Sequence, residues 1–433
     1  MPSPITRATF VAALSLLVVP GAPAHDDSER TAGRLVVADH QTPGLRILDL
    51  DTGAIVATLE LALTNPRLTT LADGRFVAVR GDDAVHFVDT GLVDEDHGDH
   101  SHVRKAAPEL LDLVLEGPRP AHFEAVNGQA AFFFDGRRDD GIAASAVVVA
   151  LDQLTAAIPD LRVWESPGPQ HGNAVPLPQG QLLVSSPNPD FVAGVTDATS
   201  RSIGFRLLDG AGDVVAAFDD LDDPVASCKD YHGYAAARGV YAFGCVENDP
   251  SAAVDGGGVL VLRDTGDGTL AAEKLAYPDA GRRAAQLRGH PRGDWIVANY
   301  GVSGDYSAFL RVPAAGGPLT ADDVWEVPNG QQFCQFAVDP SGRRLVNLTP
   351  DGVFRVVDIA SFEVLFEAPT TAAFDCAWNA TTPKPMLLVG AVDAYVSDPA
   401  NSTIFEFDLE RLQTNRAIAV PGMPANLGGG KAG

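Results

Sequence analysis

Three histidines, His122, His171 and His232, occupy the same position in three successive copies of a repeated sequence pattern. Each stands before a glycine-bearing turn that leads into an apolar strand; the turns are Asn127-Gly128, Gln179-Gly180 and Arg238-Gly239. Equivalent positions of a cyclic repeat fold gather around one axis, so we expect the three imidazoles to meet in space. Neutral imidazole is a good ligand for zinc and other borderline divalent ions. The pattern therefore predicts a structured metal site made by these three residues.

The sequence leaves the fourth ligand of this structured site open. Asp230, Glu124, a carboxylate from a neighbouring loop and water are all candidates. Water would leave an open coordination position, as in catalytic zinc centres, whereas a carboxylate would close the site. The alternative interpretation is that the three histidines are hydrogen-bonded side chains in a polar channel that holds no metal.

A second cluster of metal-ligand types lies in one acidic segment, Asp94-Glu95-Asp96-His97-Gly98-Asp99-His100-Ser101-His102, called here the histidine-rich segment. Its predicted ligands are His97, Asp99, His100 and His102. Imidazole and carboxylate suit zinc, while the lack of thiolate or thioether argues against a Cu(I) site. We expect a mobile loop, which must be ordered on binding and therefore holds the ion less tightly than a rigid site. The alternative is a solvated polar loop that binds metal only incidentally.

Motifs of common catalytic sites are missing from the chain. It has no nucleophile elbow, no phosphate-binding glycine loop, no HExxH helix and no CxxC pair. No pair of carboxylates can be assigned as acid and base from spacing alone. We therefore expect a binding protein rather than an enzyme.

The elements that must position these residues are short apolar strands that recur along the whole chain. The copies open at Arg34, Gly74, Gly128, Gly180, Gly239, Gly293, Gly342 and Pro385. Period-two alternation of apolar residues, with 43 glycines and 31 prolines, excludes a run of helices. The repeat predicts an all-β fold, a single β-propeller of eight blades with four antiparallel strands each, and seven blades as the alternative.

Blade geometry places the two groups of ligands on different faces. The innermost strand of a blade runs along the central channel, and the three histidines stand at its entry end. The histidine-rich segment joins the third strand of its blade to the fourth, so alternating strand directions carry it toward the opposite face. We expect two separate metal sites, one rigid and one mobile.

The N-terminus has the composition of a secretory signal. Arg7 supplies the positive region, residues 10–19 the apolar core and Ala22-Pro23-Ala24 the cleavage site. This core is too short to span a membrane. We expect a signal peptide at 1–24, a flexible mature terminus at 25–33, the propeller at 34–425, a flexible tail at 426–433, and a periplasmic location.

The four cysteines are expected to form two disulfides, because an exported chain folds in an oxidising space. Cys334 and Cys376 occupy the same slot before a strand in neighbouring copies, so we pair them. A Cys228–Cys245 bond would then tie one blade's entry loop to its own second strand. The alternative is that Cys228 and Cys245, which are expected near the three histidines, act as thiolate ligands.

Charge limits the partners. With 31 basic and 57 acidic side chains, the formal charge of −26 argues against nucleic acid and anionic membrane surfaces. It is compatible with cation handling, and equally with an exported protein whose charge only keeps it soluble. We expect a monomer.

These features together resemble the AztD family of periplasmic zinc metallochaperones. The resemblance rests on the signal peptide, the eight-unit propeller, the histidine-rich segment, and the histidines in 120–123, 171–174 and 232–235. It spans the whole mature chain. It implies that the protein binds Zn²⁺ in the periplasm and passes it by direct contact to the AztC-like solute-binding protein of an ABC zinc importer.

Two other function classes compete with this interpretation. A periplasmic propeller with an open three-histidine metal could act as a Lewis-acid enzyme, for example in hydrolysis. A plain interaction propeller would bind a protein partner at its rim without metal.

Overall fold

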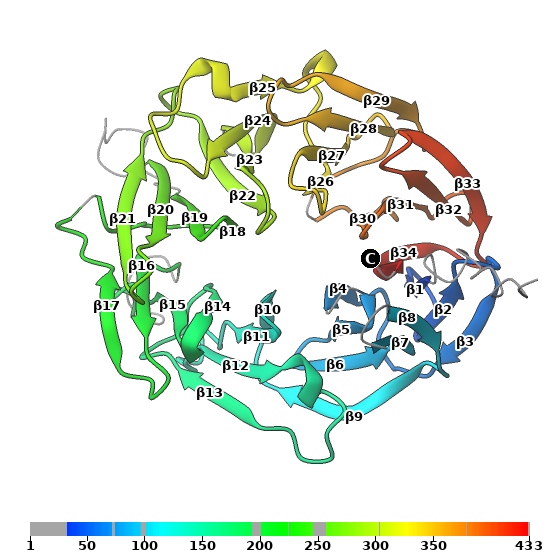
Figure 1. The fold of residues 1–433 in the computed structure, drawn as a ribbon, viewed down its shortest axis with the longest axis horizontal. Helices are drawn as coiled ribbons and strands as arrows, with labels where there is room; N and C mark the ends of the chain where they lie inside the picture. Colours follow the sequence, from blue (N-terminus) through cyan, green and yellow to red (C-terminus); the bar gives the residue numbers. More distant parts are fainter. Residues whose placement is uncertain are drawn as a thin grey trace, which may run out of the picture.

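The computed structural model describes residues 33–431 apart from 72–73, 97–100, 193–200, 224, 246–256, 303 and 378; of 94–102, no side chain is described. The described residues form eight four-stranded antiparallel sheets set radially around a central axis (Figure 1). The predicted eight-bladed propeller is thereby confirmed, and the seven-bladed alternative is wrong.

The strands of each blade follow one another from the axis outward, except in the blade that contains both chain ends (Figure 1). From innermost to outermost, four blades are β34 (Pro424–Lys431), β1 (Gly33–Asp39), β2 (Leu45–Asp49) and β3 (Ile55–Leu59); β4 (Arg67–Leu71), β5 (Phe76–Arg80), β6 (Ala84–Asp89) and β9 (Glu109–Glu116); β10 (Pro120–Val126), β11 (Gln129–Phe134), β12 (Ser145–Ala150) and β13 (Leu161–Glu165); and β14 (Ala174–Pro176), β15 (Leu182–Ser186), β16 (Gly204–Leu208) and β17 (Val214–Phe218).

The other four blades are built in the same order. They are β18 (Tyr234–Ala237), β19 (Val240–Cys245), β20 (Gly258–Asp264) and β21 (Leu270–Leu275); β22 (Arg283–Gly289), β23 (Trp295–Val302), β24 (Asp305–Pro313) and β25 (Val324–Glu326); β26 (Gln335–Val338), β27 (Arg344–Leu348), β28 (Val353–Asp358) and β29 (Val364–Pro369); and β30 (Leu387–Val389), β31 (Asp393–Asp398), β32 (Thr403–Asp408) and β33 (Gln413–Ala419). Short 3₁₀ turns lie at Leu151–Gln153, Pro178–Gly180, Ala321–Asp323 and Pro328–Gly330.

The core lies between neighbouring blades, which explains the strand sequences. Middle strands are covered on both faces and are apolar almost throughout, as in β11, where every residue after the first is buried. Outermost strands such as β13 alternate between exposed and half-buried residues. Phe87 of β6 meets Phe132 of β11 across two blades, edge to face, at 5.2 Å between ring centroids. Each such ring contributes about 1.5–3 kcal/mol by burial and holds the blades at a fixed spacing.

The C-terminal residues correct one prediction. Residues 426–433 were expected to form a flexible tail beyond a propeller ending at 425, but β34 extends to Lys431 and pairs with β1, Gly33 lying opposite Lys431. Its Gly428-Gly429-Gly430 run reads as flexible in sequence, yet the glycines serve close packing. A Cβ at Gly429 would lie 2.4 Å from the backbone oxygen of Arg34.

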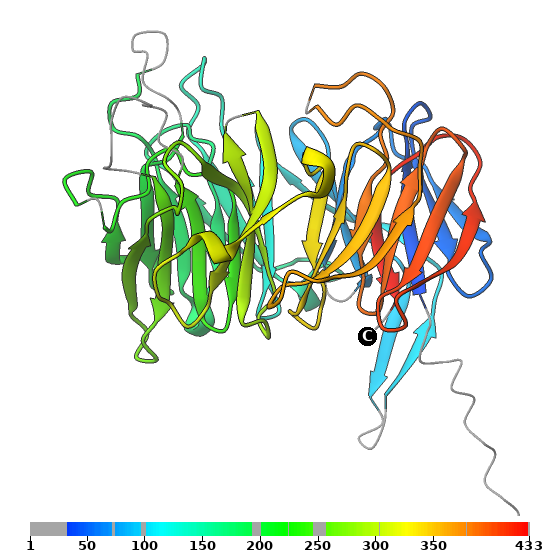
Figure 2. The ribbon, with the colours of Figure 1, turned by 90° about the horizontal axis from the view of Figure 1, so that it is seen from above.

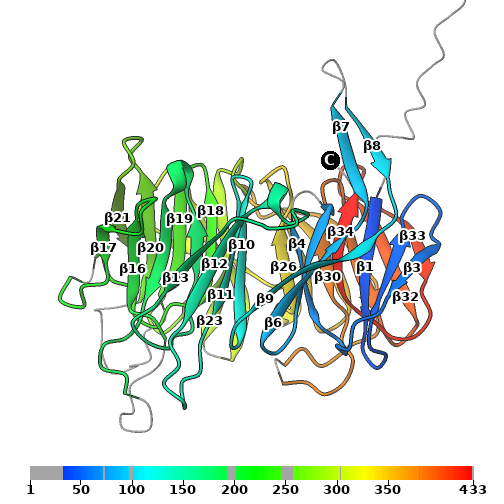
Figure 3. The same ribbon diagram turned by 90° about the horizontal axis from the view of Figure 1, so that it is seen from below.

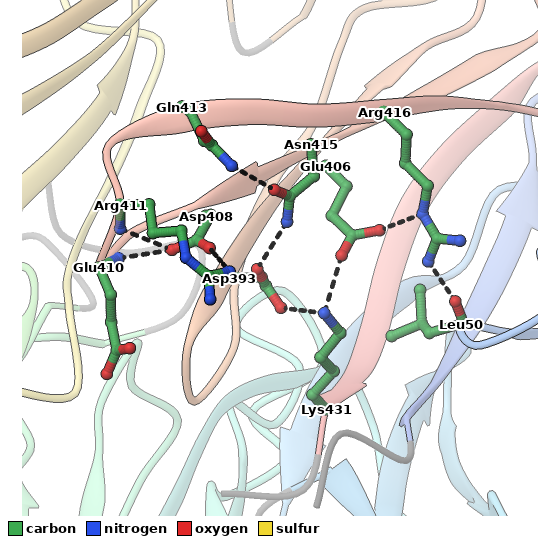
Figure 4. Close-up of polar contacts among 10 residues, drawn as sticks. All are labelled: Leu50, Asp393, Glu406, Asp408, Glu410, Arg411, Gln413, Asn415, Arg416 and Lys431. Carbon is green, nitrogen blue, oxygen red and sulfur yellow. Dashed lines mark hydrogen bonds and ion pairs between the residues drawn. The ribbon is translucent and has the colours of Figure 1, made fainter. Parts of the chain in front are cut away.

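A buried ionic cluster, called here the closing seam, fastens this last strand to the preceding blade (Figure 4). Lys431 Nζ lies 2.7 Å from Asp393 Oδ2 and 2.9 Å from Glu406 Oε1. Arg416 Nε donates to Glu406 Oε2 at 2.6 Å, and its guanidinium also donates to the backbone oxygen of Leu50. The seam therefore joins the first blade, which contains β34 and β1–β3, to the last blade, which contains β30–β33.

A two-stranded hairpin, β7 (Leu92–Asp96) and β8 (Ser101–Lys105), is inserted between β6 and β9. It projects from one face of the propeller, called here the hairpin face (Figures 2 and 3). Lys105 Nζ, at the base of the hairpin, forms ion pairs with Asp49 (2.6 Å) and Asp51 (2.5 Å), at the end of β2 in the neighbouring blade. The β7–β8 hairpin is therefore an arm whose base is held to the propeller.

Both expected disulfides are present, Cys228–Cys245 and Cys334–Cys376, with Cα–Cα separations of 5.0 and 5.5 Å. All four cysteines are thereby oxidised, so the thiolate-ligand alternative is wrong.

The predicted signal peptide and all but the last residue of the predicted flexible terminus lie outside the described residues. In the part of the chain that is described, no helix is long and apolar enough to cross a membrane.

Candidate metal centre

His122, His171 and His232 come from three consecutive blades and meet near the propeller axis. Their ring centroids are separated by 4.7 Å (His122 to His171), 5.3 Å (His171 to His232) and 6.0 Å (His122 to His232). One ring nitrogen of each lies within 4.8 Å of those of the other two. Among the described residues, no other group of three or more histidine, cysteine or carboxylate side chains comes as close.

The local backbone explains why the repeat register brings them together. His122 lies in β10 where the pairing with β11 shifts between Pro120 and Phe123, and such an irregularity re-aims a side chain. His171 forms an isolated bridge with Arg201 just before β14, and the His232 N–H donates to the Gly244 oxygen just before β18. All three side chains therefore stand where an innermost strand begins, on the face opposite the hairpin, called here the histidine face.

Two of the three histidines are followed by a glycine that has a steric role. A Cβ at Gly172 would lie 2.0 Å from Ser185 Oγ, and one at Gly233 would lie 2.5 Å from the Ala285 oxygen. Gly233 also has φ of 104°, which disfavours any side chain. The His171-Gly172 and His232-Gly233 pairs thus let the backbone beside each imidazole pack directly against a neighbouring strand.

Hydrogen bonds determine which ring nitrogen of each histidine is available. His122 Nδ1 is 2.7 Å from the Gly172 oxygen, and His232 Nδ1 is 3.3 Å from the Ala285 oxygen. His171 Nδ1 is 2.8 Å from Asp135 Oδ2. Carbonyl and carboxylate oxygens only accept, so Nδ1 carries the proton in each ring and Nε2 keeps its lone pair. Metal-binding histidines in proteins usually have such a partner on the other nitrogen.

The electrostatic environment keeps two of the rings neutral. Burial lowers the pKa of His122 well below its usual value, and the adjacent His171 and His232 lower it further. Burial lowers the pKa of His232 to about 4, with His171 and Arg201 adding to the effect. Both rings are therefore unprotonated at neutral pH, which is the state that binds a metal ion.

The carboxylates around the site do not join the three histidines as a fourth ligand. Neither Glu124 nor Asp230, both proposed from the sequence, is part of the group within 4.8 Å. Glu124 Oε1 accepts a hydrogen bond of 3.1 Å from Asn173, and burial raises the pKa of Glu124 to about 7. Asp230 is buried in the segment leading to His232, where its N–H donates to the Ser202 oxygen.

Sequence reasoning did not identify Asp135 as a functional residue. It follows β11, a second strand that ends on the histidine face, and the next blade's innermost strand begins there. This topology is the signal that points to it. A carboxylate that orients a metal-binding imidazole raises the basicity of that ligand and fixes its ring.

The arrangement can provide three nitrogens to one tetrahedral ion and leaves one coordination position to a further ligand. With Zn–N bonds of about 2.0–2.1 Å, the nitrogens of a tetrahedral site lie roughly 3.4 Å apart, and the ring nitrogens of the trio, within 4.8 Å of one another, are already near that spacing. The predicted second site is not assembled in the described part of the chain. His97, Asp99 and His100 lie outside it, and only the backbone of His102 is described, in β8.

Comparisons with known proteins agree with this fold and with the expected resemblance. No family model matches the chain. The zinc chaperone AztD of Citrobacter koseri is 27% identical over 410 residues, which cover 94% of this chain and 88% of that protein. A crystal structure of Citrobacter koseri AztD has a TM-score of 0.75 at 25% identity, and its apo structure one of 0.74 at 24%; each comparison covers 93% of this chain and 99% of the other. The resemblance to the AztD family is thereby confirmed over almost the whole chain.

Proposed function

From the geometry of the three histidines and the similarity to a zinc chaperone, we propose that this protein is a periplasmic zinc metallochaperone. It takes up zinc at His122, His171 and His232 and passes it by direct contact to the AztC-like solute-binding protein of an ABC zinc importer. The proposal is carried by two observations together: one ring nitrogen of each histidine lies within 4.8 Å of those of the other two, and every Nδ1 of the trio has an oxygen acceptor, which leaves Nε2 as the nitrogen available to a metal.

The chemistry of the site suits a cargo that must be both held and released. Three neutral imidazoles bind zinc without bringing a negative charge to the ion, and no described carboxylate closes the fourth position. A ligand from an acceptor protein can therefore bind the zinc ion at that position before the histidines release it. In this proposal zinc is cargo, and the protein carries out no reaction on a substrate.

The histidine-rich segment supplies a second, weaker site in the same proposal. Its proposed ligands are His97, Asp99 and His100, which follow β7 in sequence, and His102 of β8. The β7–β8 hairpin projects from the hairpin face (Figure 3), and we propose that this site binds an ion of its own. We assign capture of zinc to the segment and tight holding to the trio.

Titration of metal-free protein against a chelator of known affinity tests the trio. Replacing any one of the three histidines by alanine should weaken the tightest zinc-binding event on the order of a thousandfold, which exceeds the 10–100-fold typical of an orienting partner. His86→Ala, in the third strand of its blade, is the matched control and should leave zinc affinity unchanged. A trio variant with wild-type affinity would remove that residue from the ligand set.

Transfer is tested by mixing the zinc-loaded protein with the metal-free solute-binding protein. Faster hand-over than spontaneous release into a chelator supports direct contact. Equal rates would show that zinc passes through solution, and the proposal of direct transfer would then be wrong. Zinc-dependent turnover of a small ester would instead support the enzyme alternative.

A further inference from the structure

The backbone holds the three candidate ligands in unequal ways. His122 lies within β10, whose ladder with β11 continues from Phe123 to Val126. His171 is bridged to Arg201 three residues before β14 begins to pair with β15. His232 lies in a stretch, 219–233, whose described residues form no strand. Its position is therefore the one that regular strand pairing supports least.

What fixes this stretch is a small set of contacts around one disulfide. The Cys228 N–H donates to the Ile203 oxygen at 2.9 Å, and the His232 N–H donates to the Gly244 oxygen at 3.2 Å. Cys228 is also bonded to Cys245, the residue directly after Gly244 in β19. The covalent bond and the ligand's own backbone hydrogen bond thus attach to adjacent residues of one strand.

The disulfide and the histidine are also coupled through packing. Cys228 and Cys245 are fully buried in the same apolar cluster as Tyr231, the residue before His232. The Tyr231 ring lies 4.6 Å from Phe205 and 5.7 Å from Phe243, measured between centroids. A shift of the entry segment at Cys228 would disturb this packing, and Tyr231 would carry the backbone of His232 with it.

We propose that the Cys228–Cys245 disulfide is a positioning element of the metal centre. It pins the entry segment to β19, so that His232 presents Nε2 beside those of His122 and His171 before zinc arrives. Without the bond, part of the binding free energy must order the third ligand, and the observed affinity falls by that amount. The inference rests on the proposed binding of zinc by the trio.

The second disulfide provides a control within the same chain. Cys334–Cys376 joins segments that precede β26 and β30, in blades that lie two and three positions from the nearest blade of the trio, and the hydrogen bonds that orient His122, His171 and His232 go to other residues. It closes a longer loop than Cys228–Cys245, 42 residues against 17. Its removal should therefore cost at least as much chain entropy in the unfolded state. If removing a disulfide affected zinc binding only by lowering stability, removal of either bond would weaken it. If Cys228–Cys245 positions His232, only removal of that bond should weaken it.

The experiment compares the double variants Cys228→Ala/Cys245→Ala and Cys334→Ala/Cys376→Ala in the full mature protein. Zinc affinity by chelator competition, zinc dissociation rate and the thermal midpoint of metal-free protein are measured for each. Removing the first bond should weaken zinc binding roughly 10–100-fold with faster dissociation, as loss of an orienting partner does, while the second variant keeps wild-type affinity. Variants are preferred to chemical reduction, because thiol reductants themselves bind zinc.

A variant cycle shows whether the bond acts through His232. In a His232→Ala background, removing Cys228–Cys245 should cause no further loss of zinc affinity, whereas in a His122→Ala background the loss should persist. Equal loss in both backgrounds, equal loss from the two disulfide variants, or wild-type affinity without the first bond would each overturn the inference. If the wild-type protein binds zinc no more tightly than the His122→Ala variant, the proposed metal site itself is wrong, which is a separate outcome.

Should the first variant fail to fold, hydrogen exchange supplies the second measurement. Wild-type protein treated with a phosphine reductant should lose amide protection over 228–233 while β10 keeps its protection. Unchanged protection of 228–233 after the bond is reduced would contradict the positioning role.

Discussion

The metal centre and the closing seam are two polar clusters, the first half-buried and the second largely buried, that the ring of blades assembles from distant parts of the chain. In the seam, Asp393 and Glu406 are 2% and 1% exposed, and Lys431 and Arg416 supply the opposite charges. In the metal centre the hydrogen-bond partners satisfy only Nδ1 of each ring and leave Nε2 available. The difference distinguishes a structural cluster from a functional one. In the structural cluster every charged group is paired with an opposite charge, whereas in the functional cluster one nitrogen of each ring keeps an unused lone pair.

Replacing Lys431 by methionine should break the seam and spare the metal centre. Glu406 would keep Arg416, but Asp393 would lose its cation in a buried position, so the free energy of unfolding should fall by about 3 kcal/mol. Denaturant melting of the metal-free protein measures the loss, and Lys274→Met in the outermost strand β21 is the control. Zinc affinity should not change. Weaker zinc binding by the trio in this variant would show that the two clusters are coupled around the ring of blades.

Replacing Asp135 by asparagine tests the orienting partner of the trio. The amide oxygen can still accept from His171 Nδ1, but the charged hydrogen bond to the ring is lost, so zinc affinity should drop about tenfold, as for other partners of metal-binding histidines. Chelator competition measures the drop. Asp139→Asn, in the same loop on the histidine face, is the control. A thousandfold loss would instead indicate that Asp135 is itself a ligand.

The pH dependence separates the trio from exposed histidines. An exposed histidine has a pKa near 6.5, so protons would compete with zinc for it in this range. Because the pKa of His232 is lowered to about 4 and that of His122 well below its usual value, protons compete at these two rings only in more acidic solution. Zinc titrations at a series of pH values should show little proton competition from His122 and His232 just below pH 6.5. A steep loss of zinc affinity there in a variant that lacks His171 would contradict the lowered pKa values of these two rings.

The same shifts predict how the metal-free fold responds to acid. The folded pKa of each ring lies below the unfolded value, so the unfolded chain binds more protons between the two, and stability falls as pH drops from about 6.5 toward 4. Thermal midpoints of metal-free protein across this range measure the trend. The His232→Ala variant should show a shallower fall than the wild type. An identical slope would mean that His232 is not buried in its neutral form.

Replacing 94–102 by a short glycine-serine turn should have the smallest effect on the fold. Residues 94–102 belong to the insertion between β6 and β9, and Lys105 holds the base of its β7–β8 hairpin, so the propeller should melt as before. One weak zinc equivalent should disappear from the titration, and loading of the trio from dilute zinc should slow. An equal-length glycine-serine segment is the control for hairpin length. If the tightest zinc-binding event were lost instead, the assignment of the weak and the tight site would have to be reversed.

Much of this protein could be predicted from periodic local signals. Apolar alternation and turn spacing identified eight blades, since each blade must bury its own strands against its neighbours. The glycine turns at Gly128, Gly180 and Gly239 placed the three histidines in register. The same register paired the cysteines correctly, because equivalent slots of neighbouring copies are close in any closed ring.

The remaining features depend on contacts between blades, which a repeat does not encode. Gly428-Gly429-Gly430 was misread as a tail because glycine is typical of both flexible ends and crowded strands, and only the closed ring shows which applies here. Asp135, the Gly172 oxygen and the Ala285 oxygen each approach a histidine from another blade, so no local pattern identifies them. The sequence by itself determined which residues gather at the axis. Only the tertiary structure decided which ring nitrogen each histidine presents, because that depends on the one acceptor that the neighbouring blade brings within hydrogen-bonding distance.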